Sequence, residues 1–168
     1  MLLAAVPFLL LLQCPRKGRT AAITEESGFS CTARRTLSLN REVHGPPHTN
    51  DPPFEVKILD SEKNVVSMYT PGQVYTVQVS GYIHFKGLMM QPRLANEDRM
   101  VFGHMTGGYF IEEPVKWRLF GIRYMDCPYF GQPTRFWGDT ITHRNTKKKF
   151  VVKVKWSANR DEGPIQFL

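Results

Sequence analysis

Strict alternation of apolar and polar side chains is the feature that most constrains the fold of this chain. The stretch from 150 to 156 places its apolar side chains on one face, namely Phe150, Val152, Val154 and Trp156. The other face carries two lysines. The same spacing recurs at Tyr75, Val77 and Val79. A period of two is the mark of a half-buried β-strand. We therefore expect the apolar face of each of these two strands to belong to a hydrophobic core.

Turn residues separate these apolar stretches. Pro71 and Gly72 suit the central positions of a type II turn, because proline fixes φ and glycine accepts the positive φ that follows. The chain is rich in Gly (13) and Pro (12) and in aromatic residues, which favours short strands joined by loops over a helical bundle. About eight such strands predict an all-β fold, a two-sheet antiparallel sandwich.

The boundaries of individual strands follow from the same pattern. We expect Gly81 to end one strand and to precede a second, which runs from Ile83 to Met90. Residues 96–108 are interpreted as a long loop. Residues 165–168 begin a last strand that stops abruptly, so we interpret this strand as truncated.

The N-terminus resembles a secretory signal peptide. Residues 1–12 carry only apolar side chains, a run too short to cross a bilayer, which takes about 20 residues. Thr20 and Ala22 supply small residues for cleavage. We therefore interpret 1–22 as a signal peptide and 23–168 as the mature domain, with a buried N-terminal strand as the alternative for the apolar run. Cleavage would remove three cations and no acids, taking the net charge from +7 to +4, so no nucleic-acid partner is predicted.

Cysteine usage follows the same cleavage. Removing Cys14 leaves Cys31 and Cys127, an even number in an oxidising compartment, and these two are predicted to form one disulfide. The alternatives are a nucleophilic thiol or a metal ligand, but neither has a supporting CxxC or Cys/His spacing. No second hydrophobic run follows Leu12, so the chain is expected to be secreted, with no transmembrane segment of its own.

A basic cluster is the candidate ligand-binding site. Arg144, Lys147, Lys148 and Lys149 fall in one turn between two predicted strands, and Arg34 and Arg35 could join them in space. Such a cluster suits heparan sulfate, an anionic lipid or a bacterial surface. A solvated turn with no ligand is the alternative.

Other chemistry-bearing residues give weaker signals. Phe130, Phe136 and Trp137 could form an exposed aromatic contact site or could pack under their own loop. His44 and His48 are four residues apart, but the prolines between them exclude the helix that a shared metal would need. His143 has no nucleophile motif nearby and is interpreted as a loop histidine with a local hydrogen bond. No enzyme activity and no cofactor are predicted.

A series of landmarks in a fixed order resembles the reeler (reelin N-terminal) domain over most of residues 31–168. The series begins with Cys31, His44-Gly45, Pro52-Pro53-Phe54, Tyr69-x-Pro71-Gly72-x-x-Tyr75-x-Val77, Phe85-x-Gly87-Leu88 and Gln91-x-Arg93. It continues through Gly108-x-Phe110, Cys127, Thr142-His143-Arg144-Asn145, Lys149, Val154-x-Trp156 and Gly163-x-Ile165-x-Phe167. The chain departs from the family at 157–160, where a Pro-rich stretch is usual, and between Asn96 and Cys127, which is longer than expected.

The resemblance implies an extracellular, immunoglobulin-like β-sandwich without catalytic residues. Such domains stand at the front of reelin and spondins, precede other domains in ferric-chelate-reductase-like membrane proteins, and occur alone in small secreted insect defence proteins. The layout here is most similar to the stand-alone type. We therefore expect a secreted recognition module for an extracellular protein, a glycosaminoglycan or a microbial surface, in innate defence or matrix and cell-surface interaction. The alternative is a reeler domain detached from a larger reductase-like membrane protein.

Overall fold

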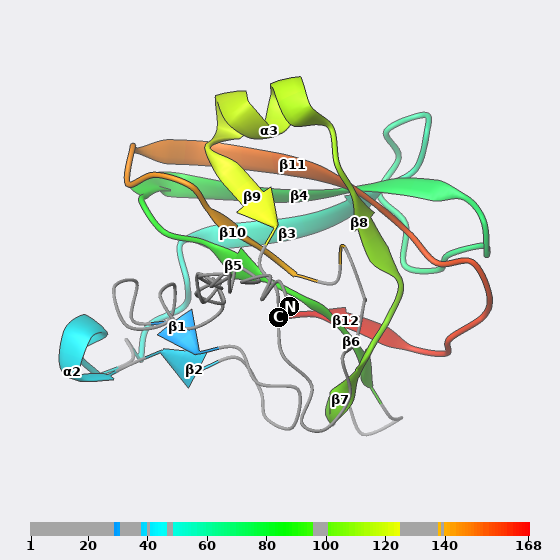
Figure 1. Ribbon diagram of the computed structural model, residues 1–168, viewed down its shortest axis with the longest axis horizontal. Helices are drawn as coiled ribbons and strands as arrows, with labels where there is room; N and C mark the ends of the chain where they lie inside the picture. Colours follow the sequence, from blue (N-terminus) through cyan, green and yellow to red (C-terminus); the bar gives the residue numbers. More distant parts are fainter. Residues whose placement is uncertain are drawn as a thin grey trace, which may run out of the picture.

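Antiparallel β-strands dominate the computed structural model, which describes residues 29–30, 38–39, 41–46, 49–95, 101–124, 138 and 140–168. The principal sheet has four strands in the order β3-β4-β11-β8. Their bounds are Phe54–Leu59 for β3, Val74–Phe85 for β4, Tyr109–Ile111 for β8 and Lys149–Ser157 for β11. All three pairings are antiparallel, which confirms the predicted sheet type (Figure 1).

Two smaller sheets form the second layer. One has the order β5-β10-β9, with bounds Met89–Met90, Ile141–His143 and Ile122–Tyr124. The other has the order β12-β6-β7, with bounds Ile165–Phe167, Pro92–Ala95 and Val101–Thr106. Strands β5 and β6 are separated only by Gln91, so one stretch of chain runs through both sheets. The second layer is thus divided, in contrast to the single second sheet that was expected.

Short elements complete the chain. A two-stranded sheet pairs β1 (Phe29–Ser30) with β2 (Ser38–Leu39), and a single helical turn, α2, spans Arg41–His44. Helix α3 covers Pro114–Phe120 and packs against β9 and β11. Because of these helices the fold is mostly β rather than all-β. Within the part of the chain that the structure describes, no helix is long and apolar enough to span a bilayer.

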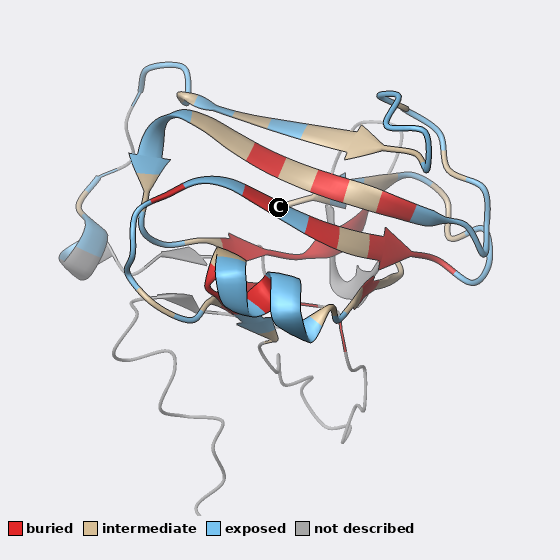
Figure 2. Cartoon of the chain, turned by 90° about the horizontal axis from the view of Figure 1, so that it is seen from above, coloured by how far each residue is buried: buried red, intermediate tan, exposed pale blue. Residues whose placement is uncertain are grey.

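The core lies between the two layers and follows the predicted alternation. Tyr75, Val77 and Val79 of β4 are buried, as are Val152, Val154 and Trp156 of β11. Figure 2 shows buried residues alternating with more exposed ones along both strands. From the second layer, Met90, Ile122 and Ile141 close the same cluster. Burial of these apolar surfaces is the main force that holds the layers together.

Phe150 is the exception to the predicted core face of β11. Its side chain is 57% exposed. The pairing between β11 and β4 is irregular here, because Lys149 opposes Phe85 whereas Val151 opposes Ser80. A bulge of this kind changes which side chain faces inward. Phe150 therefore turns to solvent and Lys149 takes the inward position.

Two strand boundaries differ from the sequence prediction. Strand β4 continues through Gly81, which packs so closely on Phe54 that a Cβ atom would lie 2.8 Å from the Phe54 ring. Residues 101–106 form β7, although 96–108 had been interpreted as loop. The prediction of a last strand is confirmed, since β12 pairs with β6. The type II turn is also confirmed: Gly72 has φ of 79° and the Gln73 amide donates to the Thr70 carbonyl.

Lys63 occupies a backbone conformation that suits glycine. It closes the turn after β3 with φ of 72°, the one positive φ among described residues other than glycine. The left-handed region costs a non-glycine residue about 1 kcal/mol. We expect Lys63→Gly to raise the free energy of unfolding by about 0.5–1 kcal/mol in urea denaturation, because it relieves this strain. The matched Glu62→Gly, one residue earlier with negative φ, should instead lower it; stabilisation by Glu62→Gly but not Lys63→Gly would contradict the assignment.

Candidate ligand-binding surface at one end of the sandwich

Three turns meet at the end of the sandwich where β10 leads into β11. The His143 amide donates to the Leu88 carbonyl at 3.0 Å, which ties the β10 end to the turn after β4. The Arg144 amide donates to the Gly121 carbonyl at 2.6 Å, which ties it to the end of α3. These backbone hydrogen bonds hold residues 144–148 against two other parts of the chain.

Gly121 lets the end of α3 approach the basic turn. It ends the helix in the left-handed conformation, with φ of 65°, where glycine carries no steric penalty. A Cβ atom at this position would lie 2.7 Å from Nδ2 of Asn145. The close approach of Asn145 therefore depends on the absence of a side chain at position 121.

Lys149 is the structural centre of this end. Its ammonium donates to the carbonyl oxygens of Lys86 at 3.2 Å, Asn145 at 2.8 Å and Lys147 at 3.0 Å. It also reaches Oδ1 of Asn145 at 3.2 Å, an oxygen that accepts the Lys147 amide as well. Carbonyl dipoles thus solvate the buried cation in place of water. Burial lowers the pKa of Lys149.

The structure separates Lys149 from the other three predicted site residues. The sequence analysis grouped Lys149 with the other three as a candidate ligand-binding residue, but its side chain is only 7% exposed, because the β11 bulge turns it inward. Arg144, Lys147 and Lys148 are exposed, as expected. Their part in ligand binding stays a prediction.

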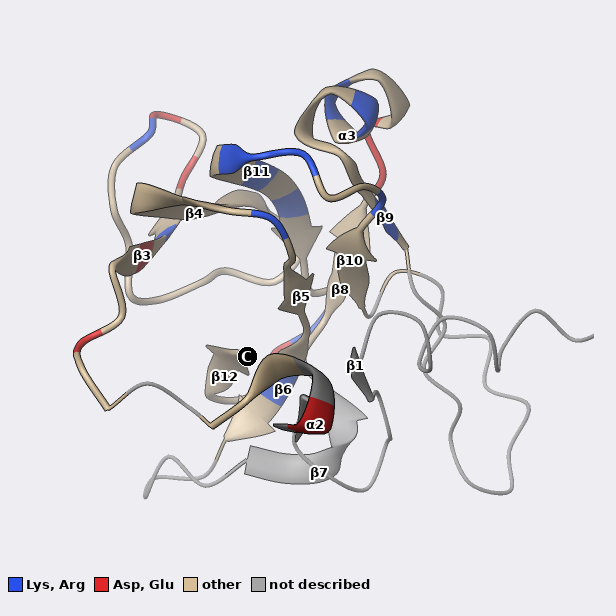
Figure 3. Cartoon of the chain, turned by 90° about the vertical axis from the view of Figure 1, so that its left-hand side faces the viewer, with Lys and Arg blue, Asp and Glu red and all other residues tan. Residues whose placement is uncertain are grey.

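Two further cations extend the exposed group. Lys86 lies in the turn after β4, and Arg123 lies on β9 opposite Thr142 of β10. Both are exposed. We call the five residues Lys86, Arg123, Arg144, Lys147 and Lys148 the basic end, and Figure 3 shows this side of the molecule. Among the described residues, none of the five makes an ion pair, so their charges are available to a ligand.

A second group of lysines was missed by the sequence analysis. Lys63, Lys116, Lys153 and Lys155 line a depression of about 330 Å³, the outer groove, on the side of the sheet next to α3. Asp60 and Glu113 line it too, and Lys116 pairs with Glu113. The alternation had placed Lys153 on the outer face of its strand, but only the fold brings α3 and the β3 turn beside it. Because two carboxylates share the outer groove, its positive potential is weaker than that of the basic end.

His143 bonds to the backbone of the turn after β4. Its Nδ1 lies 3.3 Å from the Leu88 amide and 3.2 Å from the Leu88 carbonyl. These partners are 55 residues away in sequence, and Nδ1 also lies 3.5 Å from the adjacent Thr142 hydroxyl, so the ring has a long-range contact besides the local one that was expected. His44 is exposed on α2. Among the residues that the structure describes, no three His, Cys, Asp or Glu side chains gather as a metal site would require.

Several predicted residues lie outside the described part of the chain. These are the proposed disulfide partners Cys31 and Cys127, the signal peptide 1–22, the arginines 34 and 35, His48, and the aromatic residues 130, 136 and 137. The disulfide and the cleavage site therefore stay predictions.

Solved structures that are similar to this chain include domains of F-spondin. Two solved structures of the human F-spondin reeler domain are 17% and 16% identical, with TM-scores of 0.48 and 0.46. Each covers 76% of this chain, and 81% and 82% of the solved chain respectively. The Reelin-N domain of F-spondin is 17% identical, with a TM-score of 0.48, over 75% of this chain and 78% of that one. No curated protein gives a significant match.

The family model gives the decisive match. The model described as "Reeler domain" matches residues 30–168, which includes every described strand of both layers and the whole basic end. The chain belongs to the reeler domain family.

Proposed function

We propose that this chain is an extracellular recognition module that binds an anionic glycan at the basic end. Reeler domains are extracellular and generally act as non-catalytic binding modules. One observation carries the proposal: the exposed residues Arg144, Lys147 and Lys148 lie on a turn that is held in place by hydrogen bonds from the Lys149 ammonium. A fixed turn holds the charges in one arrangement, so less conformational entropy is lost on binding.

The chemistry of the basic end favours a polyanion over a small ion. Its cations are exposed and come from three turns or strands, so they present several charges over a surface. An arginine can form two parallel hydrogen bonds with a sulfate or carboxylate, and a lysine acts as a point charge. A sulfated glycosaminoglycan repeats such groups along a chain and could contact several of the cations at once.

The biological setting follows from the resemblance to the family. We favour a secreted module in innate defence or in matrix and cell-surface interaction, since anionic polymers cover both microbial and animal cell surfaces. The alternative setting is the extracellular part of a larger ferric-chelate-reductase-like membrane protein. Both settings would use the same surface, and the proposal concerns that surface.

Removing three charges from the basic end should weaken glycan binding. We expect the triple variant Arg144→Gln, Lys147→Gln and Lys148→Gln to bind immobilised heparin about tenfold more weakly at physiological salt. Three exposed ion pairs at about 0.5 kcal/mol each account for this loss. Surface plasmon resonance at several salt concentrations measures it, and the variant should also show a smaller salt dependence.

A second triple variant controls for net charge. Lys63→Gln, Lys116→Gln and Lys153→Gln remove the same charge from the outer groove, and we expect less than a twofold change in affinity. A larger loss from the outer-groove variant than from the basic-end variant would move the glycan site to the groove. Equal losses from both would show attraction by net charge alone. Either result contradicts the proposal.

A further inference from the structure

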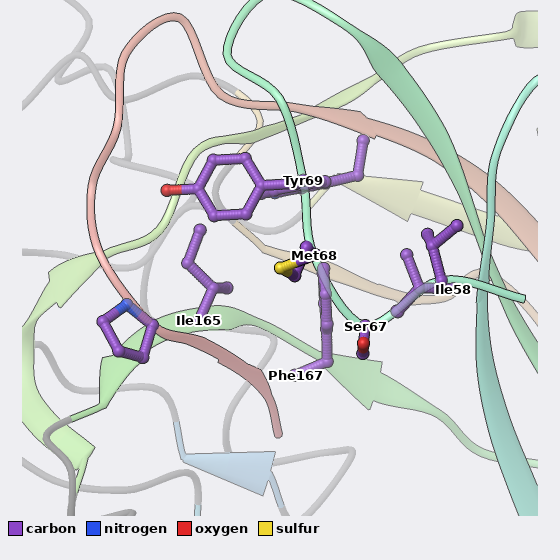
Figure 4. Close-up of a pocket in the computed structure, with 9 residues that line it drawn as sticks. Ile58, Ser67, Met68, Tyr69, Ile165 and Phe167 are labelled. Carbon is purple, nitrogen blue, oxygen red and sulfur yellow. The ribbon is translucent and has the colours of Figure 1, made fainter.

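A pocket of about 410 Å³ opens on the side of the sandwich between β3 and β12. This interlayer pocket contains none of the residues of the basic end. Figure 4 shows side chains from β3, from the 66–69 segment and from β12 around it. Its lining consists of Ile58, Val66, Ser67, Met68, Tyr69, Trp156, Pro164, Ile165 and Phe167.

The two layers leave this opening because each ends there. β3 is an edge strand of the principal sheet, and β12 is an edge strand of the second layer. Trp156 stands at the centre of an aromatic wall, with Tyr69 and Phe167 each packed edge to face against it. Both pairs of ring centroids are 5.4 Å apart, at interplanar angles of 80° and 83°. These preferred aromatic geometries make the wall preformed.

The polar atoms of this wall are already bonded within the protein. Trp156 Nε1 donates to the Gly107 carbonyl at 2.9 Å. The Tyr69 hydroxyl accepts from the Glu162 amide at 2.8 Å and donates to the Gly163 carbonyl at 3.2 Å. The surface that the aromatic wall presents to the pocket therefore consists mainly of carbon atoms. A water molecule in the pocket can form few hydrogen bonds with this wall.

Charge decides which apolar molecule fits. Among the residues that the structure describes, no Lys, Arg, Asp or Glu side chain lines the pocket, so these residues offer no partner to a ligand charge inside it. The carboxylate of Asp161 lies 3.3 Å from the Tyr69 hydroxyl, next to the pocket, and would repel an anionic head group. Among the described lining residues, the polar atoms of Tyr69 and Trp156 are already bonded within the protein, whereas the Ser67 hydroxyl could bond to a neutral hydroxyl of a ligand.

The geometry points to a binding site for a neutral molecule that consists mainly of hydrocarbon, such as a medium-chain alcohol. The pocket volume falls within the range of about 300–1,000 Å³ typical of small-molecule sites. Such a ligand places its chain against Trp156 and Phe167 and leaves its hydroxyl near Ser67. The site is separate from the glycan surface, so the two proposals stand or fall independently.

The test uses methyl groups of the full chain as reporters. ¹³C-methyl-labelled protein is titrated with decan-1-ol and, separately, with decanoate below its micelle concentration. We expect saturable shifts for the methyls of Ile58, Met68 and Ile165 with decan-1-ol, and none for Ile122 and Ile141, which are buried elsewhere in the core. Decanoate should bind at least tenfold more weakly. Absence of saturable shifts at the three pocket methyls, or equal binding of the two ligands, would overturn the proposal.

A space-filling variant ties the binding to the pocket. Ser67 is exposed at the pocket wall, so Ser67→Trp should fill the pocket and reduce decan-1-ol binding at least tenfold without unfolding the protein. The matched Ser61→Trp, in the turn after β3 and outside the pocket, should bind as the unsubstituted chain does. If Ser67→Trp fails to fold, Met68→Asp, at an 84% exposed position, should weaken binding in the same way. Unchanged affinity in a folded pocket variant would contradict the site.

Discussion

Replacing Lys149 by methionine (Lys149→Met) is expected to lower the free energy of unfolding by about 2–3 kcal/mol. The side chains are similar in volume, so the change removes the ammonium while it largely retains the packing. The carbonyls of Lys86, Asn145 and Lys147 lose their charged donor, and hydrogen bonds to charged groups are worth about 1.5–3 kcal/mol each. The variant no longer has to bury a charged ammonium, and the desolvation cost that it avoids offsets part of the lost stability. Thermal unfolding should show a Tm lower by about 5–10 °C.

The neighbouring lysine is the matched control for this prediction. Lys148 is exposed and makes no hydrogen bond or ion pair through its side chain among the described residues, so Lys148→Met should change stability by less than about 0.5 kcal/mol. Lys149→Met should also weaken heparin binding, although its ammonium does not face solvent, because the turn that holds Arg144 and Lys147 loses its brace. Equal stabilities of the two variants would show that Lys149 does not hold the turns together.

The second large effect concerns a buried polar chain in the second layer. Gln91 and Arg93 are 1% and 0% exposed. Gln91 Oε1 accepts from Arg93 Nε at 2.7 Å, and Gln91 Nε2 donates to Thr140 Oγ1 at 2.8 Å. Gln91→Leu removes one acceptor from a buried guanidinium, and we expect a loss of about 3 kcal/mol in urea denaturation.

A double variant separates this mechanism from a packing defect. If Gln91→Leu acts by depriving Arg93 of an acceptor, then Gln91→Leu combined with Arg93→Leu should cost less than the sum of the single changes. Gln166→Leu is the control, because Gln166 is exposed and lies opposite Arg93 on the neighbouring strand. Additive single effects, or a Gln166→Leu effect as large as that of Gln91→Leu, would contradict the account.

The strands and their core faces could be predicted because a period of two is a local signal. The inward position of Tyr75, Val77 and Val79 could be predicted without knowing which strands pair with theirs. The turn at Pro71 and Gly72 followed equally from local backbone preferences. Helix α3 also carried a local signal that was overlooked, with Pro114 at its first position and Gly121 just after its end.

The bulge in β11 could not be predicted, since it depends on pairing with a distant strand. Continued alternation from Trp156 back to Phe150 places Phe150 inward and Lys149 outward. The irregular pairing of Lys149 with Phe85 reverses both positions. The continuation of β4 through Gly81 likewise depends on tertiary structure, because Gly81 packs against Phe54 of the neighbouring strand.

The basic end was therefore only partly visible in the sequence. The charges of Arg144, Lys147 and Lys148 are adjacent along the chain, and this adjacency sufficed to predict a cluster. Lys86 and Arg123 join them only because the turns after β4 and α3 bond to residues 143 and 144. The structural role of Lys149 arises from the same meeting of turns, so no local pattern indicated it.

A nuclear magnetic resonance titration tests the central claim most directly. The amides of the ¹⁵N-labelled full chain are followed while a short heparin-derived oligosaccharide is added at physiological salt. We predict saturable shifts concentrated in residues 144–148 and 86–88, which the Lys149 ammonium joins. Shifts confined to the outer groove, or no saturable shift at residues 144–148, would contradict the assignment of the basic end as the ligand-binding surface.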